Sequence, residues 1–258
     1  MEIKEQNGVR INKYLSEAGV CSRREADRQV EAGNVMIDGR TAQMGDRILP
    51  GQKVQFCGKP VIQEEEKILL AFYKPTGIVC TTEKREKNNI VDYIGYKKRI
   101  YPVGRLDKDS EGLILMTNQG ELVNKIMRAG NYHEKKYIVT VNQDLTEEFL
   151  KGMAGGVYLE ELDVTTRKCQ VKKLGRRKFQ IILTQGYNRQ IRRMCEAFGY
   201  RVVYLKRTQI MNIVLGDLKP GQYRKVTGEE YAKLMKLTRH SSQTTVISRD
   251  RKIDQRID

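Results

Sequence analysis

The segment best equipped for chemistry is a short polar loop between two apolar stretches, within residues 101–115. It contains two aspartates and a glutamate, and it lacks the Ser-His or Cys-His pairs that activate a hydroxyl or a thiol. Loops held between rigid strands are a common place for reactive side chains. Covalent chemistry here would therefore use a carboxylate, and Asp107 could serve as the nucleophile. The alternative is that Arg105, Lys108 and the acids form ion pairs at the surface.

A strongly basic stretch lies further along the chain. The whole sequence has 48 Lys and Arg residues against 32 acidic residues, a formal charge of +16, and residues 165–207 contain 13 basic residues and one acidic residue. This concentration indicates a polyanionic partner, although a solvated surface that only maintains solubility has similar charge. The residues expected to contact phosphates in this stretch include Lys172, Lys173, Arg176 and Arg177.

The segment after Asn188 predicts a helix that combines apolar and basic faces. Ile191, Met194, Cys195 and Phe198 recur on one side, and Gly199 ends the pattern. The opposite side has three arginines, which we expect to point into a cleft: Arg189, Arg192 and Arg193.

The composition also argues against several other classes of protein. The five cysteines form no Cys-x-x-Cys pair, and two histidines without a nearby carboxylate cluster do not favour a zinc site. No run approaches the length of a membrane span and no signal-peptide core is present, so we expect a cytoplasmic protein with no metal.

The elements around these residues suggest two modules. Residues 11–18 predict one helix, and Ser22 with Glu25 predicts a capping box at the start of a second helix that ends at Gly33. Short strands at 35–37 and 54–56 then predict a hairpin. The second helix presents three exposed basic residues, either a phosphate-binding row or a salt-bridged surface: Arg23, Arg24 and Arg28.

The remainder predicts a mixed α/β domain after a polar linker at 63–67. The patterns indicate strands at 68–73, 114–117, 137–141 and 179–183, helices around 122–127 and 147–153, and a last helix with a Thr227 and Glu230 capping box that ends near Leu237. The variable order of strands and helices favours an antiparallel or mixed sheet. Residues 238–258 predict a disordered basic tail.

Residues 10–15 (RINKYL), 21–26 (CSRREA) and 33–35 (GNV) together resemble the small RNA-binding domain, or alpha-L motif, first described in a ribosomal small-subunit protein. This resemblance implies structured RNA as a partner. It implies no reaction, since ribosomal proteins, synthetases and modifying enzymes share the motif.

A second resemblance covers the larger module. Residues 104–107 (GRLD) and 112–118 (GLILMTN) are similar to the active-site motif of the bacterial ribosomal pseudouridine synthases of the RsuA and RluB/E/F family. The same family is matched, in order, by residues 74–77 (KPTG), 135–139 (KKYIV) and 186–194 (GYNRQIRRM). The resemblance implies an α+β protein: a helix-helix-hairpin RNA-binding domain at 9–60, and a mixed, largely antiparallel-sheet catalytic domain at 68–237.

The family resemblance also implies residue roles. Asp107 corresponds to the essential aspartate, Tyr137 to the tyrosine that lies against the target ring, and Arg192 to the arginine that pairs with the aspartate. Arg105 matches a position that can fill the space left by the extracted base, while Arg189 and Arg193 are expected to contact phosphates. Pseudouridine formation replaces a C–N bond to the sugar by a C–C bond without redox or hydrolysis, so no cofactor is expected.

Residues 108–110, 122–131 and 207–212 resemble the large-subunit branch of that family that includes RluF. We therefore expect a monomeric enzyme that isomerises a uridine in a structured stem-loop of large-subunit rRNA. The alternatives are a uridine in a tRNA anticodon loop or in small-subunit rRNA, or a non-catalytic factor that only binds rRNA. The sequence leaves open whether the aspartate attacks the sugar or the base.

Overall fold

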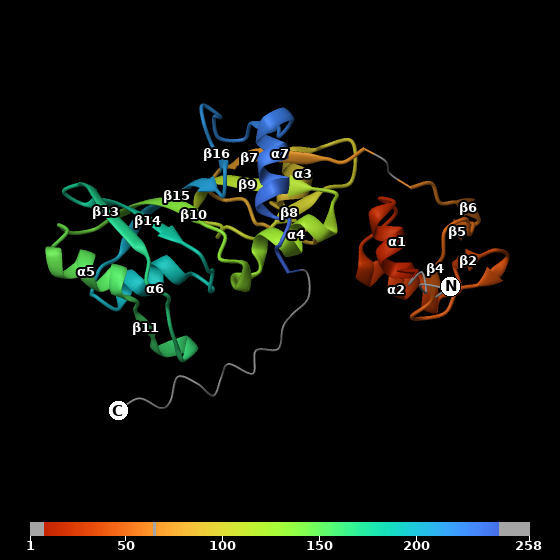
Figure 1. Ribbon diagram of the computed structural model, residues 1–258, viewed down its shortest axis with the longest axis horizontal. Helices are drawn as coiled ribbons and strands as arrows, with labels where there is room; N and C mark the ends of the chain where they lie inside the picture. The colour runs from red at the N-terminus through yellow and green to blue at the C-terminus, as the bar shows by residue number, and fades with distance from the viewer. Residues whose placement is uncertain (1–7, 64–65, 243–258) are drawn as a thin grey trace. The chain divides into compact units, whose positions relative to one another are not determined.

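The computed structural model describes residues 8–63 and 66–242, and Figure 1 shows its helices and strands. The chain forms two compact units, one containing residues up to 68 with segments 96–100 and 117–120, the other containing the remainder. No helix in the described part of the chain is long and apolar enough to cross a membrane. Two residues of the predicted linker, 64 and 65, and residues 243–258 of the predicted tail lie outside the described residues.

The first unit contains two helices and short strands, in the order that the sequence predicts. The elements are β1 (Val9–Arg10), α1 (Ile11–Glu17), α2 (Arg23–Glu31), β2 (Val35–Ile37), β3 (Arg40–Thr41), β4 (Arg47–Ile48), β5 (Val54–Phe56) and β6 (Lys59–Pro60). Strands β3, β2, β5 and β6 form an antiparallel sheet, and β1 pairs with β4. Leu15, Ala26, Val35 and Ile37 are fully buried in its core, so the helical and strand periodicities converge on one interior.

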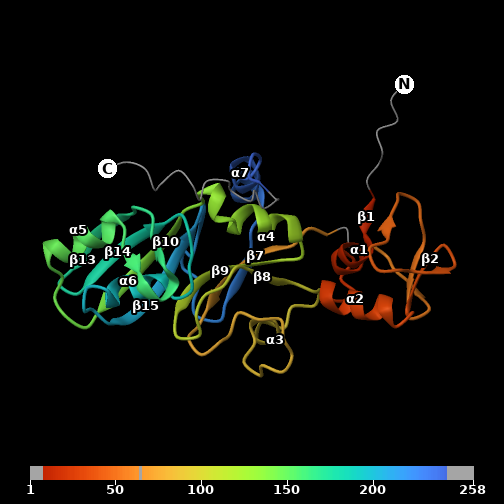
Figure 2. The same cartoon turned by 90° about the horizontal axis from the view of Figure 1, so that it is seen from below.

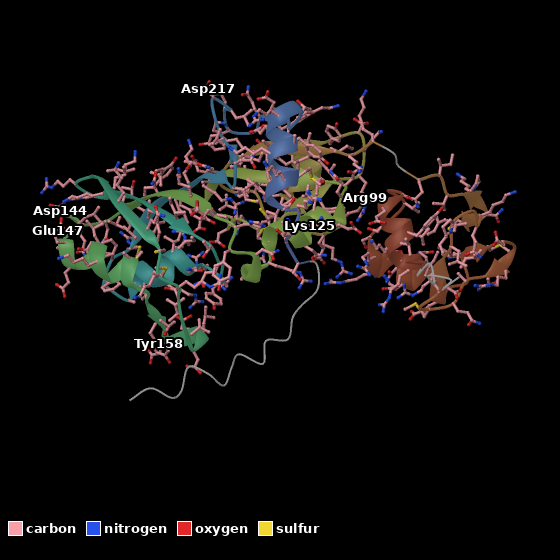
Figure 3. All side chains as sticks on the ribbon, viewed as in Figure 1. Arg99, Lys125, Asp144, Glu147, Tyr158 and Asp217 are labelled. Carbon is pink, nitrogen blue, oxygen red and sulfur yellow. The ribbon has the colours of Figure 1, made fainter. Side chains whose placement is uncertain are left out.

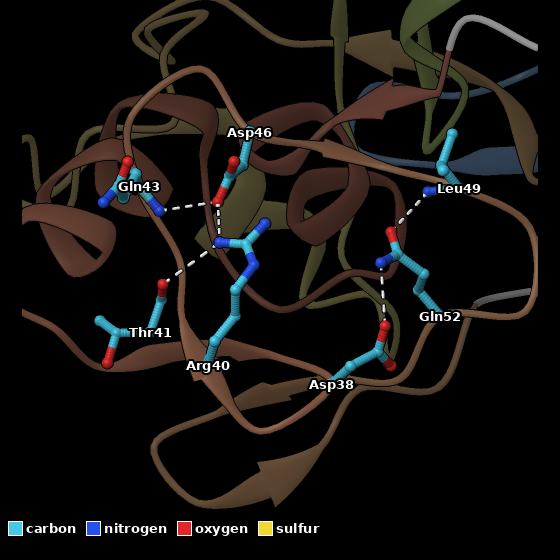
Figure 4. Close-up of polar contacts among 7 residues, drawn as sticks. All are labelled: Asp38, Arg40, Thr41, Gln43, Asp46, Leu49 and Gln52. Atoms are coloured by element: carbon cyan, nitrogen blue, oxygen red, sulfur yellow. Dashed lines mark hydrogen bonds and ion pairs between the residues drawn. The ribbon is translucent and has the colours of Figure 1, made fainter.

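Two loops of this unit are fixed by side-chain carboxylates, as Figure 4 shows. Asp46 Oδ2 accepts hydrogen bonds from Arg40 Nη1 (2.7 Å) and from the Gln43 amide (2.8 Å). Asp38 accepts from the Gln52 side chain at 2.9 Å and occupies the left-handed region at φ +48°. The turn at Asp38 and Gly39 is therefore fixed by the Gln52 side chain.

The two predicted capping boxes form only in part. Ser22 Oγ accepts a hydrogen bond from the Glu25 amide at 3.2 Å, but the Glu25 carboxylate bonds to the Gln29 amide and pairs with Arg28. Thr227 precedes α7 (Gly228–Leu237) and makes no side-chain cap, because Glu230 binds a guanidinium instead. In both cases the glutamate carboxylate binds a side chain rather than the backbone amide that the box requires, while only Ser22 makes the hydroxyl half of its box.

The second unit is built around a mixed sheet. Its strands are β7 (Leu69–Lys74), β8 (Tyr101–Val103), β9 (Glu111–Thr117), β10 (Lys135–Val141), β13 (Gln170–Gly175), β14 (Lys178–Leu183), β15 (Val202–Ile210), β16 (Ile213–Val214) and β17 (Tyr223–Lys225). The order is β13-β14-β10-β15-β9-β7-β17. The β15–β9 pair is parallel, whereas β13–β14, β14–β10, β10–β15 and β7–β17 are antiparallel. The predicted α+β fold with a mixed, largely antiparallel sheet is confirmed.

Helices cover both faces of the sheet around β7 and β9. Helix α4 (Gly120–Met127) contributes Leu122 and Ile126, and α7 contributes Leu234, to a buried cluster with the inward residues of β7 and β9. On the other face, Phe72 contacts Tyr93 of α3 (Ile90–Ile94), with ring centroids 6.1 Å apart. Figure 2 shows α3 on one side of these strands and α4 with α7 on the other. All six residues of β7 are consequently buried.

The other half of the sheet has strict alternation in its central strand. Lys135, Tyr137, Val139 and Val141 of β10 are buried and share one face, while the residues between them are partly exposed. Phe179 pairs directly with Val139 and contacts Phe149 of α5 (Glu147–Gly155). The same face therefore carries α5 and the side chains of the site.

Short elements complete this unit, among them the 3-10 helices η1 (Ala129–Asn131) and η2 (Glu160–Leu162) and the pair β11 (Tyr158–Leu159) and β12 (Val164–Thr165). The first residues of the expected disordered tail are fixed against η1. Thr238 is fully buried, and the Ser242 amide donates to Asn131 Oδ1 at 3.0 Å. Residues 238–242, which the sequence predicts as part of the disordered tail, are therefore ordered.

Candidate active site

Glycines at two positions shape the loop that contains Asp107. Gly104 has φ +77° and Gly112 has φ +109°, a region that other residues rarely adopt. A Cβ at Gly112 would lie 2.2 Å from the Arg207 carbonyl oxygen, and a Cβ at Gly104 would lie 2.2 Å from Met127 Cε. The loop can thus approach β15 only because Gly112 lacks a side chain, whereas at Gly104 the positive φ is the constraint.

Neighbouring segments hold the loop between these glycines. The Gly77 amide donates to the Lys108 carbonyl at 2.8 Å, and the Leu106 amide points to Cys80 Sγ at 3.4 Å. Gly77 belongs to the KPTG turn, where the fully buried Lys74 donates to two turn carbonyls at 2.8 and 2.9 Å. Burial lowers the pKa of Lys74. This motif thus forms a rigid support for the loop.

Two cavities open on either side of the loop. One of about 380 Å³ lies over β10, β14 and β15 and is lined by Asp107 and Tyr137, among others. The second, of about 470 Å³, lies towards the KPTG turn and is lined by Gly77 and Cys80. Arg105, Asp107 and Arg189 line both. We refer to the first as the β10 cavity; its volume is in the range of small-molecule sites.

The two aspartates of the loop have different surroundings. Asp109 pairs with Arg192 at 3.2 Å and with Arg189 at 3.5 Å. The Asp107 carboxylate, by contrast, has no hydrogen bond or ion pair to any residue within 8–63 and 66–242. The expected pairing of Arg192 with Asp107 is therefore wrong for this structure, since Asp109 takes that arginine. The consequence is a carboxylate that faces the β10 cavity with its lone pairs unused.

Charge in the β10 cavity is strongly asymmetric. Among its described lining residues Asp107 is the only acid, whereas five are cationic: Arg105, Lys135, Arg189, Arg192 and Arg207. A partly enclosed site of this kind attracts anionic groups and stabilises negative charge that develops inside it.

Tyr137 is 9% exposed and lies in the wall of this cavity. Strand β10 changes register with β15 between Lys136 and Tyr137, an irregularity that redirects side chains. Tyr137 is directly opposite Ile181 on one side and Arg207 on the other. The sheet thus presents a flat aromatic ring next to a guanidinium.

Helix α6 (Gln190–Glu196) carries the predicted arginines, but they do not act as one face. Ile191, Met194 and Cys195 are buried as predicted. Arg189, at φ +51°, precedes the helix, and Arg192 is only 7% exposed; both line the β10 cavity. Arg193 does not line either cavity and pairs with Glu161 of η2.

The sequence patterns missed three residues of the site. Arg207 is 1% exposed, Lys135 and Gln185 are each 5% exposed, and all three line the β10 cavity. Three buried side-chain nitrogens in this cavity wall have no hydrogen-bond partner in the described structure: Arg207 Nη2, Gln185 Nε2 and Arg192 Nε. A basic residue at an inward-facing position of an apolar strand would have indicated Arg207. Strand β15, which contains it, was not predicted from the sequence.

Burial strongly affects Lys135. Desolvation, with the nearby Arg207 charge, lowers the pKa of Lys135 to about 8. Its ammonium donates one hydrogen bond, to the His133 carbonyl at 3.2 Å. The fold therefore keeps a second cation beside Arg207 although its charged form is disfavoured there.

The residues predicted to bind RNA lie mostly at the surface. Arg23, Arg24 and Arg28 of α2 are exposed, although Arg28 pairs with Glu25 at 2.5 Å. Lys172 and Lys173 are exposed on edge strand β13. Arg176 and Arg177 donate to one carboxylate, Asp144, at 2.6 and 3.0 Å, near the left end of Figure 3. These contacts offset part of the charge at this turn; the roles in RNA binding stay predictions.

Comparisons with known proteins agree with the fold. The family model for RNA pseudouridylate synthase matches residues 68–197, and that for the S4 domain matches residues 9–54. The chain is 52% identical to "Dual-specificity RNA pseudouridine synthase RluF" of Escherichia coli strain K12, over 92% of this chain and 81% of that protein. It is 32% identical to "Ribosomal large subunit pseudouridine synthase B" of Bacillus subtilis strain 168, over 90% and 97%. A crystal structure of a pseudouridylate synthase superposes with a TM-score of 0.64 at 25% identity, over 89% of this chain and all of that one.

Fold, site and relatives define an RNA-modifying isomerase with an appended RNA-binding domain. The chain belongs to the pseudouridine synthase family of the RsuA and RluB/E/F type. The predicted family and enzyme class are thereby confirmed.

Proposed function

We propose that this enzyme isomerises one uridine in a structured stem-loop of large-subunit rRNA, with the Asp107 carboxylate as the nucleophile. The observation that carries the proposal is the unpaired Asp107 carboxylate in a cavity otherwise lined by cations. A carboxylate without a protein partner has free lone pairs for attack.

The cavity supports each step of the reaction. A uridine within a helix is shielded by stacking, so the target must leave the stack, at a cost of a few kcal/mol. Tyr137 can hold the extracted ring by stacking, worth about 1–3 kcal/mol. Arg105 lines both cavities and is exposed, which suits a side chain that occupies the vacated space in the RNA.

The target class rests on the relatives and on the first unit. Residues 9–60 would bind structured RNA, and residues 68–237 would perform the isomerisation. The relatives in Escherichia coli and Bacillus subtilis are named for dual specificity and for the large ribosomal subunit, respectively. Because one name states dual specificity, a tRNA anticodon-loop uridine is the second candidate target.

Single-turnover conversion of defined RNAs tests the target. Purified enzyme is mixed with transcripts of large-subunit rRNA, small-subunit rRNA and tRNA, and pseudouridine is mapped in each. We expect conversion at one uridine of the large-subunit transcript. Conversion confined to tRNA or to small-subunit rRNA would replace the target, and binding without conversion of any transcript would favour a non-catalytic rRNA-binding factor.

The role of Asp107 is tested by Asp107→Asn, with Asp144→Asn as the control, since Asp144 lines neither cavity. Removing a nucleophile should lower the single-turnover rate by about 10³-fold or more while RNA affinity changes by less than about threefold. Substantial pseudouridine formation by Asp107→Asn would exclude the carboxylate as nucleophile.

A further inference from the structure

Arg207 occupies an unusual position for a charged residue. Its side chain is 1% exposed, and in the described part of the chain no acidic group lies within ion-pair distance of it. Two nitrogens are engaged: Nε donates to the Leu113 carbonyl at 2.7 Å and Nη1 to the Arg105 carbonyl at 3.3 Å. These carbonyls lie on either side of Asp107 in the chain, so the guanidinium bridges the two ends of the catalytic loop.

The third nitrogen of this guanidinium has no partner among the described residues. Nη2 is buried, makes no hydrogen bond, and belongs to a residue that lines the β10 cavity opposite Tyr137. Buried charged donors are normally satisfied, since leaving one without an acceptor is unfavourable. An acceptor that occupies the cavity during the reaction would satisfy it.

The chemistry of the reaction supplies such an acceptor. As the Asp107 carboxylate bonds to sugar C1′, the bond between C1′ and uracil N1 breaks, the electron pair stays on the base, and its negative charge spreads onto the two carbonyl oxygens, O2 and O4. C5 then attacks C1′ with a pair of ring electrons, which breaks the bond to Asp107 and releases its carboxylate, and the proton on C5 is transferred to N1. Atoms and charge balance without another reactant.

The symmetry of uracil makes a fixed donor useful in both halves of the reaction. Turning the ring by half a revolution about the N3–C6 axis exchanges N1 with C5 and, at the same time, exchanges O2 with O4. A donor held at one place can therefore meet one carbonyl oxygen before the rotation and the other after it. The two backbone hydrogen bonds of Arg207 hold its free N–H in this way.

We propose that Arg207 is a further catalytic residue, whose Nη2–H donates to a carbonyl oxygen of the detached uracil and stabilises its negative charge until C5 bonds to the sugar. This inference rests on the proposed function. A preorganised donor at developing charge acts mainly on the rate and little on affinity for the whole RNA. Lys135 and Arg192, in the same cavity wall, add positive potential without replacing this contact.

The first test removes the donor. Arg207→Met should lower the single-turnover rate by about 10²- to 10³-fold. RNA affinity should stay within about threefold. The control is Arg224→Met, because Arg224 is paired with Glu230 at 2.5 Å and lines neither cavity. If the wild-type enzyme converts no RNA, the proposed function fails; if the wild type is active and folded Arg207→Met is equally fast, only the role of Arg207 is overturned.

The second test pairs this variant with altered substrates. RNAs carry 2-thiouridine or 4-thiouridine at the target, because sulfur accepts hydrogen bonds more weakly than oxygen. For each enzyme we compare the rate with the oxygen-containing RNA to the rate with the sulfur-containing RNA. For at least one of the two thiouridines, this ratio should differ at least about fivefold between the wild type and Arg207→Met, as expected for groups in contact. Equal effects of sulfur in both enzymes would overturn the contact.

If Arg207→Met does not fold, shown by loss of its thermal transition, a structure of Asp107→Asn bound to the unreacted RNA decides. Nη2 should then lie within hydrogen-bond distance of O2 or O4 of the target uracil. An Nη2 that instead bonds to the side chain at position 107, or to a phosphate, would overturn the proposal.

Discussion

The two units of this protein use positive charge in different ways. Arg23, Arg24 and Arg28 of the first unit are exposed, and their charges remain hydrated. In the second unit, Lys135, Arg192 and Arg207 are each less than a tenth exposed and face a cavity with one carboxylate. Exposed cations act over a distance that salt limits, whereas buried cations act at short range and reduce the stability of the fold. We propose that the exposed cations hold the RNA and that the buried cations act on the target base.

The largest expected effect concerns the stability cost of a buried cation. Lys135→Met keeps the volume of the side chain and should raise the free energy of unfolding at pH 7 by about 2–3 kcal/mol, since the pKa of Lys135 falls from 10.5 to about 8 on folding. Because the folded-state pKa is the lower one, the cost applies fully below pH 8 and disappears as pH rises to about 10.5. The stability advantage of the variant should shrink over that range.

Urea unfolding of the full chain at pH 7 and pH 10 measures this difference. Lys136→Met is the matched control, since the neighbouring lysine is partly exposed. A variant at position 135 that is less stable than the wild type at pH 7 would show that the ammonium contributes to the fold.

An intermediate effect, on the reaction rate, is expected when Asp109, which pairs with two arginines, is replaced. In Asp109→Asn, Arg189 and Arg192 lose their carboxylate partner, and Arg192 becomes available to pair with Asp107. We expect a single-turnover rate lower by about 10- to 100-fold, the range for hydrogen bonds to charged groups. RNA affinity should change little.

Asp144→Asn is the control for Asp109→Asn, because Asp144 also binds two arginines but lines neither cavity. It should keep the wild-type rate. Equal rates in the two variants would show that the free state of Asp107 does not depend on Asp109.

The smallest effect is expected for the exposed cations. Changing Arg23, Arg24 and Arg28 together to Gln should weaken RNA binding about tenfold at moderate salt. The slope of the logarithm of the binding constant against the logarithm of the salt concentration should become shallower by about 0.7–0.9 for each phosphate that is no longer neutralised. The rate at saturating enzyme should be unchanged, in contrast to the buried cations. Titrations at several salt concentrations measure this, with the paired Arg40→Gln as a control in the same unit. An unchanged slope would show that α2 faces away from RNA.

Local signals in the sequence predicted most elements. The two helices and hairpin of the first unit, the buried strand β7 and helix α6 follow from periodicity and from stop signals such as Gly33 and Gly199, which depend on neighbours along the chain. Strand β15 was missed, and its residues pair with residues of the parallel strand β9 that lie 95 positions earlier in the chain (Lys206 with Glu111). No local pattern encodes such a pairing.

The capping boxes formed only in part, for a different reason. Ser, Thr and Glu at the right spacing offer a cap, but the Glu25 and Glu230 carboxylates bind other side chains. These partners lie only three to six residues away, so the sequence contains both the cap and its competitor, and the folded chain decides which contact forms.

By itself, the sequence determined the class of reaction: its ordered motifs carry the family resemblance, and the proposed nucleophile, Asp107, lies among them. Tertiary structure alone decided which aspartate is free. Asp107 and Asp109 are two residues apart in one loop, but two arginines near α6 neutralise only Asp109. It also decided that Arg207 faces Tyr137, because cross-strand register places residues 70 positions apart side by side. Hydrogen bonding and desolvation depend on such distant neighbours, so identical side chains receive different roles only once the chain has folded.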